Sequence, residues 1–598
     1  MNSHKGALTL RDLLATSLLE VPAFQRAYAW EENPHLRDFF EDLNAHPPQF
    51  GYFLGTFLLT QANGGADTRF RHQSVVDGQQ RLTTACIFVS AARARLSVLG
   101  GDRELAADCE NLFISDAVGR RRKFRTIRED DPFFERFIIG PEEATDADIA
   151  TPSQRRLWNA KNYFRRVLAT CEESTIGRLL STLLKSQILV YAVNTDVEAT
   201  QIFELQNDRG KRLTDLEPVK SYLMHGLYLQ GHADVQGDLR FVQQDFEAIY
   251  RAAEQIEAQP EVPSDDQILQ YHCIAFETWV RLEERVEGWR QPKELIKKVV
   301  SSEDRRGGLT PPEWIKRCSG RIKDSFTATL QILRARDTVE ALGDLTALGR
   351  IAPFWPVLLK CWRADRTPGR SRFAEAVRAM ERFAFRSVIA GKRSDAGVSD
   401  LRVLARDFVG NFDELVKRLG ELRNGWGIET DYVQGLNSPN FYDYDHAATY
   451  LLWRYENHLR SRQGQQWPRL SWTTLIAPAT DAQRFAKDHI EPKDEGNERL
   501  KRLAKWNPDD AEERERPFGE IFLHRLGNLV LDSVSAGAAK GAGGFKDRIA
   551  HYTSRSELLS QGEVVTLFAT VNDGSYEWDE TAIRSRHKAL VDFAREHW

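Results

Sequence analysis

A strand that turns through a glycine directly into a helix is the feature that most constrains how this chain folds. Residues 70–77 have the character of a strand, Gly78 follows, and apolar residues then recur every three or four positions over 82–96. Two further strands are predicted at 51–60 and 187–193, where aromatic and β-branched residues gather. Strands mixed with helices in this way predict an α/β domain over residues 1–235.

The hydrophobic pattern changes twice along the rest of the chain. Residues 236–444 show helical spacing without strand alternation, most clearly at 265–286 and 371–389, which predicts a helical connector. Residues 445–598 are mixed again, with helices predicted at 447–459 and 577–598 around a strongly apolar segment at 521–531. The predicted fold class is therefore α+β with several domains, which agrees with a length of 598 residues.

Composition indicates the cellular compartment in which the protein is expected. No run of about 18 apolar residues occurs, so no membrane span is predicted, and the first residues lack the apolar run of a signal peptide. The six cysteines are scattered without a CxxC pair, which argues against a disulfide framework or a thiolate zinc site. A reducing cytoplasm is the predicted location.

The net charge of -5 is not typical of a protein that coats DNA. It does not exclude DNA binding, because local basic patches determine the electrostatic field at a binding groove. Basic runs at 120–123 with Arg125, and at 501–502 with Lys505, are candidate patches. The alternative is that both are solvated faces of helices.

The strand–turn–helix motif is the first candidate site. A glycine turn aims free backbone N–H groups and the positive end of a helix at one point, which suits a phosphate. Arg81 adds a forked donor, and Asp77 is suited to holding a divalent cation or accepting a proton. The predicted nucleotide-binding residues here are Asp77, Gly78, Gln79, Gln80, Arg81 and Thr83. No Walker motif is present, and the alternative is a plain turn in which Gln79 and Arg81 cap and pair.

Aromatic and polar residues gather in a second cluster at 22–30. Strand alternation predicts Gln25 on one face and Arg26, Tyr28 and Trp30 on the other. Aromatic rings beside an arginine suit stacking on a nucleic-acid base, so these residues are predicted to sense DNA. The alternative is an N-terminal strand that packs its aromatic residues into the core.

The third candidate site pairs Asp488-His489-Ile490-Glu491-Pro492 with the segment at 524–531, which contains Leu-Gly-Asn528-Leu. Metal-assisted phosphodiester hydrolysis requires a base to activate water and a hard divalent cation for the phosphate. His489 is the predicted base, Asp488 the metal ligand, and Asn528 the group that orients the imidazole. The first segment is predicted to end a strand beside which the second returns. Cleavage is expected to fall as pH drops through about 6.5, the ordinary histidine value.

The N-terminal motifs resemble those of GmrSD-type modification-dependent restriction enzymes and of the related phosphorothioation-sensing SspE proteins. The resemblance rests on the clusters at 22–30 and 77–84, with 202–210 and 213–220, in that order. It implies a ParB/sulfiredoxin-like domain that binds and hydrolyses a nucleoside triphosphate, with GTP as the expected nucleotide and Asp77 and Arg81 as catalytic residues. It also implies that Asn207, Arg209, Gly210 and Lys220 complete the nucleotide site, and that the segment near Gln25 senses modified DNA.

The C-terminal motifs resemble the His-Me finger (HNH) nuclease domain of the same enzymes, which implies Mg²⁺ or Mn²⁺. Trp578, Ile583, Arg586 and Leu590 fit the closing pattern of that domain. The third element departs from it, because Gly537 and Ala542 stand where the family usually carries asparagine. Either another residue binds the metal, or the metal site is weakened, or the chain is an engineered inactive form.

Together these motifs predict an antiphage DNA nickase in which cleavage is coupled to nucleotide hydrolysis and to sensing of DNA modification. Its predicted partners are modified DNA and a nucleoside triphosphate, with a homo-oligomer left open. Two alternatives remain at this point: a regulatory nucleotide- or DNA-binding protein with a vestigial nuclease, which Ala542 favours, and a toxin that cleaves RNA. The intact set of Asp488, His489 and Asn528 favours the enzyme.

Overall fold

The computed structural model divides into two compact units, Met1–Arg334 and Ala335–Trp598. The boundary between them falls inside the predicted connector at 236–444, and the predicted division at 235 and 444 stays a prediction. The structure describes residues 7–46, 51–61, 69–115, 121–193, 214–229, 234–277, 281–283, 286–476, 485–493, 497–533, 545–555, 558–571 and 578–598.

The first unit contains a mixed sheet of six strands. These are β1 (Ala7–Thr9), β2 (Ser17–Glu20), β3 (Phe53–Gln61), β4 (Arg71–Asp77), β5 (Phe124–Arg125) and β6 (Gln187–Val193). Their order across the sheet is β1-β6-β3-β4-β2-β5. The β1–β6 and β3–β4 pairs are antiparallel, and the other neighbours are parallel. The strands predicted at 51–60, 70–77 and 187–193 are confirmed as β3, β4 and β6.

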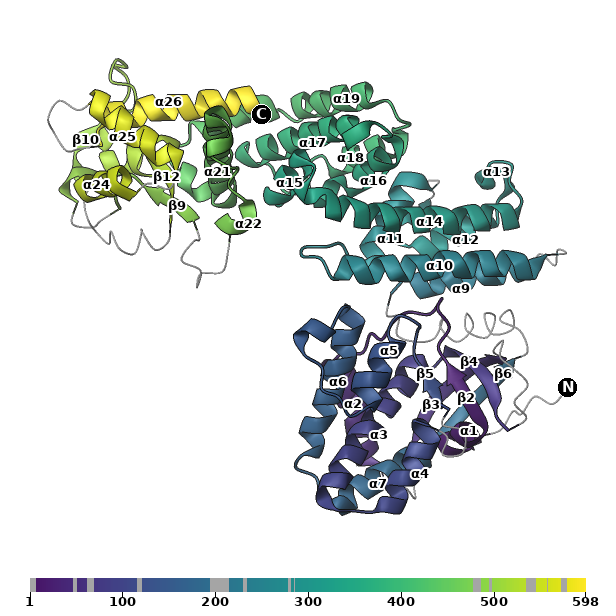
Figure 1. Ribbon diagram of the computed structural model, residues 1–598. Helices are drawn as coiled ribbons and strands as arrows, with labels where there is room; N and C mark the ends of the chain where they lie inside the picture. The colour runs from purple at the N-terminus through teal and green to yellow at the C-terminus, as the bar shows by residue number, and fades with distance from the viewer. Residues whose placement is uncertain are drawn as a thin grey trace. The chain divides into compact units, whose positions relative to one another are not determined.

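Helices cover one face of this sheet and enclose the core of the unit (Figure 1). They are α1 (Leu10–Thr16), α2 (Arg37–Ala45), α3 (Gln79–Leu99), α4 (Arg103–Phe113), α5 (Asp131–Phe133), α6 (Pro152–Leu168) and α7 (Glu173–Leu184). The central helix is α3, because Phe88 packs edge to face against Phe39 and Phe164. Among the described helices, only α3 is long and apolar enough to cross a membrane, and most of its apolar window is buried in this core.

The turn between β4 and α3 requires a glycine. Gly78 has φ of 93°, and a Cβ there would lie 2.6 Å from the ring of Phe57. A side chain at this position would therefore be strained by the backbone and would clash with the core. The strand–turn–helix predicted from the sequence is confirmed.

The described residues from 214 to 334 form helices and a small hairpin. The helices are α9 (Leu216–Leu229), α10 (Val235–Glu257), α11 (Asp265–Phe276), α12 (Pro292–Val300), α13 (Glu303–Arg306) and α14 (Pro311–Arg334). The helical spacing predicted through residue 286 is wrong beyond Phe276, where the chain forms the hairpin of β7 (Arg281–Glu283) and β8 (Val286–Glu287).

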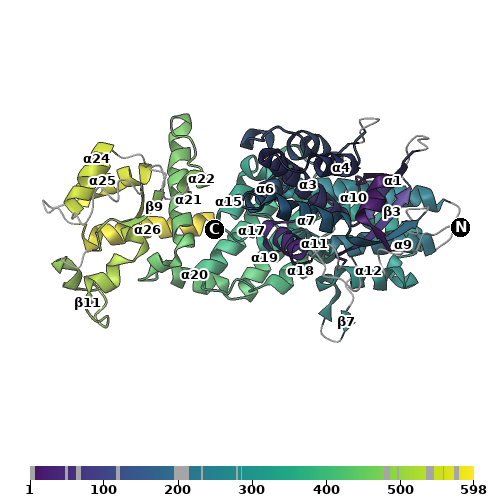
Figure 2. The ribbon, with the colours of Figure 1, turned by 90° about the horizontal axis from the view of Figure 1, so that it is seen from below.

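Among its described residues, the second unit is mostly helical and contains two short antiparallel pairs of strands, β9 (Phe485–His489) with β12 (Leu529–Ser533) and β10 (Leu503–Ala504) with β11 (Arg516–Pro517). Its helices are α15 (Glu340–Ala347), α16 (Trp355–Ala364), α17 (Ser371–Ile389), α18 (Val398–Asp407), α19 (Phe412–Gly425), α20 (Ile428–Leu436), α21 (His446–Gln463), α22 (Trp472–Leu475), α24 (Phe545–Arg555), α25 (Leu559–Val571) and α26 (Glu580–His597). The helices predicted at 371–389, 447–459 and 577–598 are confirmed as α17, α21 and α26. Helices α21 and α26 cross steeply in two views (Figures 1 and 2).

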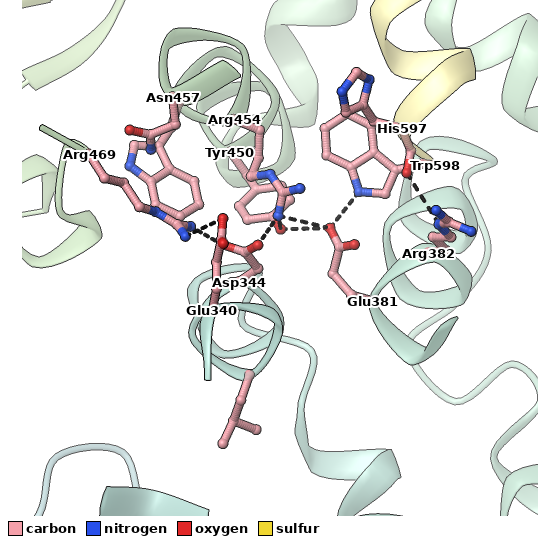
Figure 3. Close-up of polar contacts among 12 residues, drawn as sticks. Glu340, Asp344, Glu381, Arg382, Tyr450, Arg454, Asn457, Arg469, His597 and Trp598 are labelled. Atoms are coloured by element: carbon pink, nitrogen blue, oxygen red, sulfur yellow. Dashed lines mark hydrogen bonds and ion pairs between the residues drawn. The ribbon is translucent and has the colours of Figure 1, made fainter. Parts of the chain in front are cut away.

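A buried polar network ties α15, α17, α21 and the residue after α26 together (Figure 3). The Glu381 carboxylate accepts hydrogen bonds from the Tyr450 hydroxyl at 2.7 Å and from the Trp598 indole, while Arg454 pairs with Asp344. Glu381 is 4% exposed. Because each buried charge here has a partner, the network fixes these helices relative to one another.

Candidate active site

The candidate nuclease site is built on the antiparallel pair of β9 (Phe485–His489) and β12 (Leu529–Ser533). His489 ends β9 and lies opposite Leu529, the first residue of β12. Ile490 then donates its backbone N–H to the Asn528 carbonyl at 2.8 Å. The prediction that the first segment ends a strand and that the second returns beside it is confirmed.

His489 lies in a cluster of three rings. Its side chain stacks on Tyr442, with ring centroids 4.6 Å apart and planes 20° apart. The His489 Nε2 atom is 3.1 Å from Nδ1 of His524, which is a hydrogen bond between two imidazoles. The His489 residue is 8% exposed, so the ring is held on one face by Tyr442 and at one nitrogen by His524.

Burial keeps the His489 imidazole neutral. Burial lowers its pKa to about 4, with a further contribution from His524, although Asp488 acts in the opposite direction. The neutral ring that a general base requires therefore persists well below pH 6.5. The value of about 6.5 belongs to a solvated imidazole, so the predicted fall in cleavage is now expected at a lower pH, and it stays a prediction.

Asn528 acts on the backbone that follows His489. Its Oδ1 accepts the N–H of Glu491 at 2.8 Å, and its Nδ2 donates to the carbonyls of Glu491 at 3.2 Å and Leu523 at 2.8 Å. Asn528 is fully buried. These bonds use both ends of its amide on backbone groups, so Asn528 fixes the loop after β9, and its predicted role in orienting the imidazole stays a prediction.

A buried arginine holds Asn528 from the other side. The Arg586 guanidinium donates to the carbonyls of Gly527, at 3.3 Å, and of Leu529, the residues that flank Asn528. Arg586 is 5% exposed and comes from α26. Arg586, a residue of the predicted closing pattern, therefore holds the backbone on both sides of Asn528.

Asp488, the predicted metal ligand, already has two partners. Its Oδ1 accepts the N–H of His489 at 2.8 Å, and its Oδ2 forms an ion pair with Arg548 of α24. A carboxylate is the right ligand for a hard cation, but a cation here has to displace Arg548 and take its other ligands largely from water. Among the described residues, no group of three or more His, Cys, Asp or Glu could hold a metal. Gly537 and Ala542 lie outside the described residues.

In the first unit, Arg81 points toward β3, an interior strand of the sheet, rather than into the open turn. Its guanidinium donates to the carbonyls of Leu54 at 3.2 Å and Thr56 at 2.8 Å on β3, and it lies 3.7 Å from Asp77. Burial raises the pKa of Asp77 against the effect of Arg81. This is the arrangement of the alternative in which Arg81 pairs and packs, and its role toward phosphate stays a prediction.

Gln79 and Gln80 join the predicted nucleotide motif to the predicted DNA-sensing segment. Gln79 Nε2 donates to the Arg26 carbonyl at 3.2 Å. Gln80 donates to the Ala27 carbonyl at 3.1 Å and accepts the Ala29 N–H at 2.9 Å. The two motifs therefore form one hydrogen-bonded surface, which their separation along the chain did not reveal. Thr83 uses its hydroxyl within α3, donating to the Gln79 carbonyl at 2.7 Å.

The sensing segment is not a strand, and the predicted alternation of its faces is wrong. Gln25 and Tyr28 are both 4% exposed, and the Tyr28 hydroxyl lies 2.8 Å from the Thr84 hydroxyl. Tyr28 is therefore a core residue, whereas Trp30 is only partly buried against the core, and the DNA-sensing role of these residues stays a prediction. Gln25 lines a cavity of about 180 Å³, and Arg26 faces Glu217 at 3.8 Å.

Lys220 connects α9 to the same segment. Its Nζ donates to the Phe24 carbonyl and to Gln25 Oε1, both at 3.2 Å, and burial lowers its pKa to about 8. Its predicted role at a nucleotide is untested. Asn207, Arg209 and Gly210, which were predicted to complete that site, lie outside the described residues.

Asp130 lies on the same cavity as Gln25. Its carboxyl accepts the Ser153 hydroxyl at 2.6 Å, and Glu254 accepts the Ser153 backbone N–H at 2.6 Å. Burial, together with the charges of Glu254 and Glu129, raises the pKa of Asp130 to about 7. The cavity is thus lined by a carboxyl group whose pKa is far above its usual range.

The predicted basic patches are largely paired. Arg122 bonds Asp131 at 2.7 Å, and Lys123 is 1% exposed with its ammonium 3.9 Å from the Phe70 ring. Lys501 pairs with Glu498 at 2.7 Å. These charges serve the fold, in agreement with the solvated or structural alternative.

Four residues of these sites were missed by the sequence analysis. His524 stands inside a segment that was recognised, and its imidazole was a signal left unused. Tyr442 precedes the predicted domain boundary, and Arg548 follows Asp488 by 60 residues. Asp130 carries no motif at all. Only the fold brings the last three to their partners.

Two family descriptions match this chain. GmrSD restriction endonuclease, N-terminal domain, matches residues 10–224, which contain strands β2 to β6 of the sheet and the glycine turn. GmrSD restriction endonucleases, C-terminal domain, matches residues 429–593, which contain His489 and both strands of the candidate nuclease site. The chain belongs to the GmrSD restriction endonuclease family. No curated protein matches it. As a restriction endonuclease of this family, the protein is a nuclease that acts on DNA.

Proposed function

We propose that this GmrSD-family protein nicks DNA with His489 as the general base. The observation that carries the proposal is a buried, neutral imidazole at the end of β9, held by Tyr442 and His524 beside the carboxylate of Asp488. A histidine at a strand end, a returning strand and the following helix α24, which reaches Asp488 through Arg548, are what a His-Me finger fold requires.

In the proposed reaction, His489 takes a proton from water as the water oxygen bonds to phosphorus. The bond from phosphorus to the leaving ribose oxygen breaks, and that oxygen takes a proton from solvent. Because the His489 Nε2 atom is engaged with His524, Nδ1 is the nitrogen left for the water proton. Asp488 would hold a divalent cation, Mg²⁺ or Mn²⁺, which would supply charge neutralisation at the phosphate.

We propose further that the first unit binds and hydrolyses a nucleoside triphosphate, GTP in the first instance, on a ParB/sulfiredoxin-like fold. The glycine turn before α3, and the bonds that join it to residues 26–29, support a site in which a nucleotide and modified DNA influence each other. A cytoplasmic location and a defence role against phage complete the proposal.

The first test is nicking of supercoiled plasmid with Mg²⁺ or Mn²⁺. His489→Ala should lower the nicking rate by about a hundredfold to ten-thousandfold, the usual cost of losing a general base. His551→Ala, on α24 in the same unit, is the matched control and should nick at the parental rate. Equal nicking by His489→Ala and the parent would overturn the assignment of the base.

Two further arms separate the alternatives. Cleavage of an RNA substrate in preference to the plasmid would favour the toxin, and no nicking of any plasmid would favour a vestigial nuclease. Modified and unmodified plasmids, each with and without GTP or ATP, then test coupling and sensing. Nicking that is indifferent to both modification and nucleotide would contradict the proposed regulation.

A further inference from the structure

His524 lies directly against the proposed base, and neither the sequence motifs nor the comparisons give it a role. It follows a short helical turn at Gly519–Leu523, and its ring centroid is 5.1 Å from that of His489. Its backbone carbonyl accepts the N–H of Tyr442 at 2.9 Å. Tyr442, which stacks on His489, is therefore held in place by His524, which forms a hydrogen bond with the His489 ring.

A hydrogen bond between two neutral imidazoles fixes the tautomers of the rings as well as the distance between them. One of the two nitrogens, His489 Nε2 or His524 Nδ1, must carry the proton and the other must accept it. If His489 donates, its Nδ1 is left with a lone pair and faces away from His524. If His524 donates, His489 carries its proton on Nδ1 and has no lone pair left for water.

The other polar groups around His489 do not set this choice. The side-chain amide of Asn528 bonds to the backbone of Glu491 and Leu523. The carboxylate of Asp488 accepts the His489 backbone N–H and pairs with Arg548. Among the described residues, His524 is the hydrogen-bond partner that the His489 ring has. Tyr442 limits the tilt of that ring by stacking but offers it no hydrogen bond there.

We propose that His524 is a positioning residue that accepts the Nε2 proton of His489 and so presents the Nδ1 lone pair to the attacking water. The inference rests on the proposed function of His489. It assigns to the nuclease site a second imidazole that does not touch the reacting atoms and acts through the tautomer of the first.

The kinetic test compares two substitutions at 524. Asn places its side-chain oxygen near the position of Nδ1 and so keeps a hydrogen-bond acceptor there. Leu keeps a similar side-chain volume but removes the acceptor. His524→Leu should lower kcat of plasmid nicking by about tenfold or more, with KM within about twofold, and His524→Asn should recover most of the loss. Equal rates for Leu and the parent, or equal losses for Leu and Asn, would overturn the proposal.

A spectroscopic test separates this inference from the proposed function. In full-length protein labelled with ¹⁵N at histidine, the ring of His489 is identified by the signals lost in His489→Gln. The proton should reside on Nε2 in the parent and in His524→Asn, and should redistribute toward Nδ1 in His524→Leu. A proton on Nδ1 in the parent would overturn the positioning role, whether or not the protein nicks DNA. Absence of nicking with the expected tautomer would instead count against the proposed function alone.

Discussion

Asp130 shows at the scale of one residue how burial couples the fold to pH. Its carboxyl faces Ser153 and Gln154 on α6 and Glu254 on α10, with Glu129 beside it in the chain. The folded pKa of about 7 is above the ordinary value of 3.8, so the folded state binds the proton more tightly. The stabilisation from this proton is complete below the ordinary pKa, and it is lost as pH rises through about 7.

Asp130→Asn removes this titration and keeps an acceptor for Ser153. At about 1.4 kcal/mol per pH unit, the variant should gain about 2–3 kcal/mol relative to the parent between pH 5 and pH 8. Thermal melts of the full chain at pH 5 and pH 8 measure this difference in the free energy of unfolding. Glu129→Gln, which makes the same change of charge on the neighbouring side chain, is the control. A difference between Asp130→Asn and parent that does not grow with pH would contradict the shifted pKa.

Arg548 occupies the carboxylate that would hold the proposed divalent cation. Because its guanidinium is paired with the Asp488 carboxylate and only 8% of its side chain is exposed, a cation must break a charge-assisted bond to reach Asp488. Such a bond is worth about 1.5–3 kcal/mol, so Arg548→Gln should bind Mn²⁺ about tenfold to a hundredfold more tightly. Mn²⁺ titration followed by electron paramagnetic resonance measures the affinity. Lys546→Gln, an exposed residue on the same helix, controls for net charge. Unchanged or weaker binding in Arg548→Gln would show that Asp488 is not the ligand.

At this scale the sequence identifies residues better than it identifies their contacts. The positions of His489 and Asn528 followed from motif spacing. The partners of Asn528 did not, because an amide bonds equally well to an imidazole or to backbone, and only the packing of the loop after β9 decides. Arg548 and Tyr442 carry no local signal of their approach to the site.

At the scale of elements, the hydrogen bonds from α3 hold the sensing segment in place. Gln80 is the one side chain there that both accepts from this segment, at the Ala29 N–H, and donates to it, at the Ala27 carbonyl. Gln80→Ala should therefore speed hydrogen exchange of the Ala29 amide by about tenfold or more, since two bonds of about 1 kcal/mol each are lost. Gln79→Ala removes one bond to the Arg26 carbonyl and leaves the Ala29 N–H protected, so it is the matched control. Equal exchange in the two variants would contradict the role of Gln80.

Elements with strong periodicity were predictable, and those decided by tertiary packing were not. The bounds of α17 coincide with the predicted 371–389, because its apolar residues repeat through the whole helix. The segment at 22–30 alternates like a strand in sequence, but its backbone bonds to the side chains of Gln79 and Gln80 on α3 and forms no strand. The β7–β8 hairpin replaces the second half of a predicted helix, since a short apolar run has no decisive period.

For the whole molecule, the division into two compact units places the two chemistries on separate cores. The glycine turn, Asp77 and Lys220 belong to the first unit, and His489, His524 and Asp488 belong to the second. Each constellation draws its hydrogen bonds from its own unit. The two proposed activities are therefore expected to be separable by mutation even if ligands couple them.

Separability gives the last prediction. His489→Ala should abolish nicking while its nucleotide turnover stays within about twofold of the parent, because substitutions at sites on separate cores with no shared partners act independently. Asp77→Asn should lose nucleotide turnover, and its nicking should no longer change when nucleotide is added. Both rates are measured on the same preparations, as phosphate release and as plasmid relaxation. Loss of nucleotide turnover in His489→Ala would mean that the nuclease site takes part in hydrolysis. Nicking by Asp77→Asn that still responds to nucleotide would place the regulatory nucleotide away from the glycine turn.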